Sequence, residues 1–207
     1  MARGSARNAR HAAPRQLGGV EGNSRFTGSL AAVLLLLLFV EGVTIVSIGS
    51  LLTLHVFVGI LLIPPALYKI GSAAWRFAKY YRRQPDYQRK GPPVLLLRVL
   101  GPAVVVLTGL VLGSGVGLIL VHGSWRSSLL FVHQASFIVW FGAMVIHVLG
   151  HLGETIHLAP LDWLRRTRSL VGGSSGRRWA VASSLSLGLI AALAFTPLAN
   201  GWFTQPF

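Results

Sequence analysis

The chain has 207 residues, of which 53% are hydrophobic and 12% charged, and its formal net charge is +14. Its apolar residues fall into long runs almost free of charge, and runs of about 18 or more such residues indicate membrane-spanning helices rather than a water-soluble fold. The chain has no cysteine. This excludes covalent haem attachment through CxxCH, thiolate-bound iron–sulfur clusters and disulfides.

Five apolar runs predict an all-α membrane protein, a transmembrane helical bundle with spans at 27–48, 51–72, 93–121, 129–151 and 179–198. The arginine-rich, acid-poor N-terminus predicts a disordered basic arm. The fifth span has no ionisable group and is expected to serve in packing or partner contact. The expected organisation is an arm over 1–25, a four-helix core over 26–157, a linker over 158–178, and the fifth helix with a short outer tail over 179–207.

The positive charge is concentrated on one side of this predicted bundle. Of the 19 Lys and Arg residues, only Arg126 falls on the opposite side. The positive-inside rule therefore predicts a multi-pass protein whose N-terminus is cytoplasmic and whose C-terminus is outside. No segment outside the spans is long enough to fold around a nucleic acid, so we expect no nucleic acid partner and assign the charge to topology.

Three histidines lie in or beside the fourth span, where imidazole is costly to bury. His133 and His147 are 14 residues apart, which places them about 40° apart on one helix face and roughly 21 Å apart along the axis. His55 occupies the outer position of the second span, which runs parallel to the fourth. His55 and His133 can therefore meet at one depth, an arrangement suited to two axial ligands of a b-type haem. The alternative is that each histidine hydrogen-bonds a backbone carbonyl of a neighbouring helix.

The residue types favour haem over other metal groups. Two neutral imidazoles from different helices satisfy six-coordinate haem iron without adding charge to an apolar slot. Zinc or paired metal ions would require further carboxylate or thiolate ligands close by. Gly109, Gly113 and Gly117 leave a smooth face on the third span that permits close approach.

These segments resemble the bacterial cytochrome b561/cytochrome b-type membrane proteins. The resemblance covers residues 27–157 and rests on LHVFVGILL, on LLFVHQASFIVWFGAMVIHVLGH, and on PPVLLLRVLGPAVVVLTGLVLGSGVGL between them. It implies a four-helix core that holds two haems and passes electrons between a quinone and a partner. It also implies location in the bacterial plasma membrane.

The sequence departs from that family at one position, because Lys69 stands 14 residues after His55, where a two-haem protein has its fourth histidine. Three alternatives follow for His147: no second haem, a second haem with an unusual ligand, or a site completed by His151 or another subunit. Lys69 can instead extend its amine to water. We expect one haem b at His55 and His133, with His147 as a candidate ligand and His151 as an interfacial or supporting group.

Two further polar residues border the expected outer site. Glu41 lies about 10 Å deep in the first span, and intramembrane acids are functional candidates by default. It is a candidate proton carrier for a quinone or a hydrogen-bonded structural acid. His122, at the outer end of the third span, borders the same site.

The predicted function is a membrane b-type cytochrome subunit, and the alternative is a haem-free transporter or assembly subunit. We expect the chain to be surrounded by membrane lipid. The expected electron partner is a quinone or a separate redox protein, because the chain carries no flavin, iron–sulfur or c-haem motif of its own. The sequence leaves open whether the subunit is itself catalytic and whether it forms an oligomer.

Overall fold

The computed structural model describes residues 18–91, 94–121 and 123–199, and it is an all-α bundle. The helices α1, α2, α4, α5 and α6 are each long and apolar enough to cross a membrane, so the predicted fold class is confirmed. A short helix α3 and a 3-10 turn η2 complete the described elements. Their bounds are α1 Gly19–Val46, α2 Ile48–Tyr81, α3 Pro85–Lys90, α4 Leu95–Leu120, α5 Trp125–Leu158, α6 Ser174–Phe195 and η2 Thr196–Ala199.

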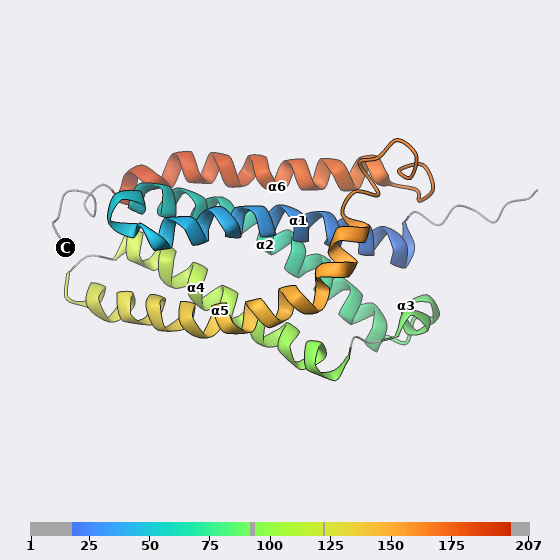
Figure 1. The fold of residues 1–207 in the computed structure, drawn as a ribbon, viewed down its shortest axis with the longest axis horizontal. Coiled ribbons are helices and arrows are strands. Elements are labelled where there is room, and N and C mark those ends of the chain that lie inside the picture. Colours follow the sequence, from blue (N-terminus) through green and yellow to red (C-terminus); the bar gives the residue numbers. More distant parts are fainter. Residues whose placement is uncertain (1–17, 92–93, 122, 200–207) are drawn as a thin grey trace, which may run out of the picture.

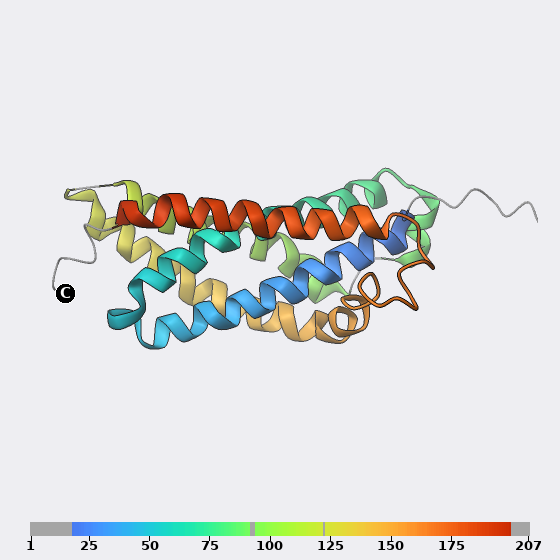
Figure 2. The same cartoon turned by 90° about the horizontal axis from the view of Figure 1, so that it is seen from above.

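The long helices run along the long axis of the molecule and group into two layers (Figure 1). In one layer α1 packs along α2 and α6 covers α2, and in the other α4 packs along α5. Contacts between the layers, from α2 to α4 and from α1 to α5, are less extensive. Figure 2 shows α6 lying along the bundle as its outermost helix. Helices α1, α2, α4 and α5 make up these two layers, and α6 packs along α2 on the side away from α4 and α5.

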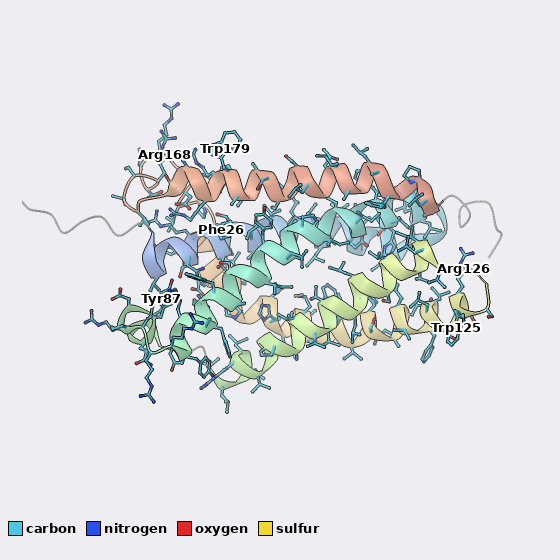
Figure 3. All side chains as sticks on the ribbon, turned by 180° about the vertical axis from the view of Figure 1, so that it is seen from behind. Phe26, Tyr87, Trp125, Arg126, Arg168 and Trp179 are labelled. Carbon is cyan, nitrogen blue, oxygen red and sulfur yellow. The ribbon has the colours of Figure 1, made fainter. Side chains whose placement is uncertain are left out.

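Charge separates the two ends of this bundle. One end of the bundle, which we call the basic end, contains the start of α1, the end of α2, α3, the start of α4, the end of α5 and the start of α6. Figure 3 shows Arg168, Trp179 and Tyr87 at the basic end and Trp125 with Arg126 at the opposite end. The folded chain thus keeps the uneven distribution of Lys and Arg between its two ends from which the sequence predicts the orientation in the membrane.

Much of the apolar surface faces outward. Leu36, Phe39, Phe131 and Ile138 are each two-thirds or more exposed. Such an exposed apolar belt around a helical bundle is compatible with lipid contact, because hydrocarbon chains replace the protein neighbours that a soluble fold would need.

The N-terminal helix begins earlier than the sequence suggested. Residues up to 25 were expected to form an arm, yet α1 starts at Gly19, and residues 1–17 lie outside the described part. The reason is a tertiary contact: Arg25 is only 5% exposed, and it donates to Glu21 Oε1 at 3.0 Å and to the carbonyl of Thr167 at 3.0 Å. Packing against the α5–α6 connection therefore holds the first turns of α1 in place.

Helices α2 and α5 are also longer than their expected spans. Each has 34 residues, or about 51 Å at 1.5 Å per residue, against roughly 30 Å of hydrocarbon core. Each is therefore longer than an untilted helix needs to cross that core. One residue, Ser47, separates α1 from α2, so these two helices form a tight hairpin at the opposite end.

Candidate functional site

The imidazole rings of His55 on α2 and His133 on α5 face each other across the two layers. Their ring centres are 6.2 Å apart and their planes are inclined by 80°. An ion held by two opposed imidazole nitrogens at metal–nitrogen distances of about 2 Å places the ring centres roughly 6 Å apart. The rings can rotate about that axis, so a perpendicular pair is permitted. The ring-centre separation therefore matches that of two imidazoles bound to one metal ion.

The Nδ1 atom of His55 is held by two groups from α1. It lies 3.0 Å from Oε1 of Glu41 and 3.0 Å from Oγ1 of Thr44. The Thr44 hydroxyl donates its own proton to the Glu41 carbonyl at 2.6 Å, so its oxygen can only accept from the ring. Nδ1 therefore carries the hydrogen, and Thr44 and Glu41 fix the ring orientation.

The Nδ1 atom of His133 has a parallel arrangement on α4. It lies 3.1 Å from the carbonyl oxygen of Val111 and 3.0 Å from Oγ of Ser114. The Ser114 hydroxyl donates to the Leu110 carbonyl at 2.6 Å, which again leaves the ring nitrogen as the donor. Both histidines thus have Nδ1 protonated and Nε2 with a free lone pair.

This tautomer is the one that a metal-binding histidine requires. Such residues commonly donate one ring N–H to a carboxylate or a backbone carbonyl and bind the metal through the other nitrogen. Neither Nε2 atom is hydrogen-bonded to any residue in the described part of the chain. The backbone-carbonyl alternative accounts for Nδ1 of His133 but leaves both Nε2 atoms without a role.

Small residues and loose packing accompany the histidine pair. A Cβ on Gly115 would lie 3.2 Å from Cε1 of His133, so glycine is what lets α4 approach this ring. In contrast, a Cβ on Gly109 or Gly113 would meet nothing within 4 Å, and Gly117 packs on Leu129.

In the described part, α4 buries only Val104 and Ser114, and α5 only Trp140 and Leu158. The two layers are therefore joined by few closely packed side chains near the histidine pair.

Toward the basic end, His147 has different neighbours from His133. Its ring centre is 4.8 Å from that of His151 on the same helix, and Lys69 of α2 is close enough to interact with it electrostatically. The His147 Nδ1 atom is buried without a hydrogen-bond partner. Within the described residues, the structure brings no other helix's histidine to His147.

His151 belongs to a polar series that reaches the surface of the basic end. Its Nδ1 lies 3.6 Å from Oε2 of Glu154, whose Oε1 lies 3.3 Å from Nζ of Lys90. Lys90 also donates to the hydroxyl of Ser24 at 2.7 Å. His151 is therefore tied to charged groups at the basic end.

Of the side chains that hold the two rings, only Glu41 is predicted from the sequence. Thr44 follows Glu41 by about one helical turn, and Ser114 is the polar residue between two glycines of α4; both spacings were readable but pointed to no partner. The Val111 carbonyl has no sequence signal at all. His122, the remaining candidate, lies outside the described residues.

Comparison with known proteins found no matching family model, no matching curated protein and no matching solved structure.

Proposed function

We propose that this chain is a membrane b-type cytochrome subunit that holds one haem b between His55 and His133. The observation that carries the proposal is the 6.2 Å separation of two imidazole rings from different helices, each with Nδ1 already engaged. Two histidines that served only packing would have no need of matched tautomers and free Nε2 atoms.

The donor set fits haem better than a bare metal ion. Structural zinc takes four protein ligands, and the described residues contain no cluster of three or more His, Cys, Asp or Glu side chains able to hold a metal ion. Haem supplies four equatorial nitrogens itself, so two axial imidazoles are sufficient. The limited packing between the layers, together with Gly115 beside His133, supports a flat group between α2 and α5.

Haem iron would supply one-electron transfer, and the chain would control its position and its surroundings. His55 and His133 would hold the iron through Nε2, and Thr44, Glu41 and Val111 would keep those rings in the required tautomer. The apolar faces of α4 and α5 would exclude water from the group, and two histidine ligands would leave no open iron position for oxygen, which favours electron exchange.

The electron partner is proposed to be a quinone or a separate redox protein, as in the cytochrome b561-type proteins that the sequence resembles. The site lies far from the basic end, which the positive-inside rule assigns to the cytoplasm. The subunit would then exchange electrons near the outer face of a bacterial plasma membrane.

One haem rather than two is proposed, because the α2 residue 14 positions after His55 is Lys69 and not a histidine. Lysine near a membrane boundary can keep its ammonium group in water, and in that form it has no lone pair for iron. His147 remains a predicted ligand only if another subunit completes its site.

The test is absorbance of the full chain purified from cells supplied with haem precursor. The expected result is reduced-minus-oxidised bands of a bis-imidazole haem at one haem per chain, lost in His55→Ala and in His133→Ala. His157→Ala, an exposed histidine of α5, is the matched control and should keep the bands. A colourless wild-type preparation would favour the haem-free transporter or assembly subunit instead.

A further inference from the structure

Two adjacent arginines at the start of α6 have opposite surroundings. Arg177 forms a paired contact with Asp162, with its Nε 2.5 Å from Oδ2 and its Nη2 2.7 Å from Oδ1. Arg178 makes no hydrogen bond and no ion pair with any described residue, and its Nε atom is buried without a partner. The charge of Arg177 is therefore neutralised inside the protein, whereas that of Arg178 has no counter-charge among the described residues.

Arg178 lines a shallow pocket of about 250 Å³ at the basic end. The pocket is formed by the connection after α5 and the first turns of α6, and its other lining residues are Trp163, Ser175, Trp179 and Ala182. Figure 3 shows Trp179 near Arg168 at this end, pointing away from the bundle. Trp163 is half exposed and Trp179 is 73% exposed, and Trp163 donates from Nε1 to the hydroxyl of Ser29 at 3.4 Å.

This combination matches the boundary between hydrocarbon and headgroups in a bilayer. Tryptophan is enriched at that depth because its ring is apolar and its N–H is polar. A guanidinium group presents a planar set of donors that fits a phosphate group. Arg165, Arg166 and Arg168 lie in the same connection and add a positive field that attracts anionic lipids.

We propose that Trp163, Arg178 and Trp179 form a binding site for the phosphate of an anionic phospholipid. Arg178 holds the phosphate, and the two indole rings pack against the glycerol and the first methylenes of the acyl chains. The apolar walls favour a lipid over an acidic peptide, whose backbone would need polar partners that these walls do not offer. The site is independent of the proposed haem.

Native mass spectrometry of the full chain in detergent tests the proposal, with phosphatidylglycerol and phosphatidylcholine added at equal concentration. The wild-type chain should retain phosphatidylglycerol preferentially, and Arg178→Gln should weaken that retention about tenfold, as expected when a charge-assisted hydrogen bond is lost. Arg165→Gln removes the same charge from an exposed position and should change retention little.

Three results would overturn this assignment. Equal weakening in the Arg178 and Arg165 variants would indicate diffuse attraction without a defined site. Unchanged retention in Arg178→Gln would place the lipid elsewhere. Competition by inorganic phosphate at the same concentration as the lipid would indicate a phosphate site that does not need acyl chains. Trp179→Leu, which keeps every charge, provides a second variant and should also lower retention if the indole packs on the lipid.

Discussion

The carboxyl group of Glu41 lies 3.0 Å from Nδ1 of His55, whereas Nδ1 of His133 contacts only the neutral oxygens of Val111 and Ser114. The two rings that face each other are therefore electronically unequal. A carboxylate partner makes an imidazole a stronger electron donor than a carbonyl partner does. The two candidate ligands thus differ in basicity although their geometry is matched.

Replacing Glu41 with Gln should raise the midpoint potential of the proposed haem. The amide keeps a hydrogen-bond acceptor but removes negative charge, so the oxidised iron loses stabilisation. A shift on the order of 60 mV corresponds to a tenfold change for one electron. Spectroelectrochemical titration measures it, and Glu154→Gln at the basic end is the matched control. An unchanged potential would mean that Glu41 positions His55 without tuning it.

Lys69→His should create a second haem site. The substitution places an imidazole on α2 14 residues after His55, just as His147 follows His133 by 14 residues on α5. The expected outcome is a rise from one haem to two per chain, measured by pyridine haemochrome against protein concentration. Lys79→His makes the same chemical change at a residue that instead lies over Trp75, 4.4 Å from its ring centre, and should leave the stoichiometry at one. A ratio of one in both variants would show that depth alone does not complete the site.

Gly115→Val should lower haem content. A side chain at this position would push against Cε1 of His133, and overpacking of this kind costs about 1–3 kcal/mol. Gly113→Val is the control, because a Cβ there meets nothing within 4 Å. Haem occupancy after identical purification distinguishes them, and equal occupancy in the two variants would contradict the proposed role of Gly115.

Asp162→Asn should destabilise the basic end irrespective of any cofactor. Asp162 is 1% exposed; it pairs with Arg177 and lies 3.7 Å from Arg25. Removing one member of a buried ion pair leaves a charge without compensation and costs roughly 3–5 kcal/mol. Thermal unfolding in detergent should show a marked drop in Tm, whereas Asp86→Asn on the exposed surface of α3 should be almost neutral. A similar Tm in both variants would mean that the Asp162 network adds little to stability.

The spans were predictable because they depend on composition summed over many residues. An apolar run of membrane length can be recognised without reference to the rest of the chain. The matched depth of His55 and His133 followed from counting residues along two parallel helices. The helix ends were less predictable. The early start of α1 depends on Arg25 meeting Asp162 and Thr167, contacts between residues far apart in sequence that no local pattern encodes.

The same distinction applies to the candidate site. The residue types and their spacing predicted a facing pair of histidines. The contacts of Thr44, Ser114 and Val111 with these rings are seen only in the folded structure. Their role depends on how two neighbouring helices are rotated about their axes. Packing sets that rotation, and one sequence leaves it undetermined when both helices are apolar nearly all round.

The connection through Ser47 alone has a consequence for the order of assembly. With so short a link, α1 and α2 can meet as soon as both have left the ribosome, because local contacts need little loop closure. Glu41 and Thr44 would then hydrogen-bond to His55 before α5 has been synthesised. The His55 side of the proposed site would therefore form first, with its imidazole ring already oriented. The site would be completed when α5 packs against it and brings His133 opposite.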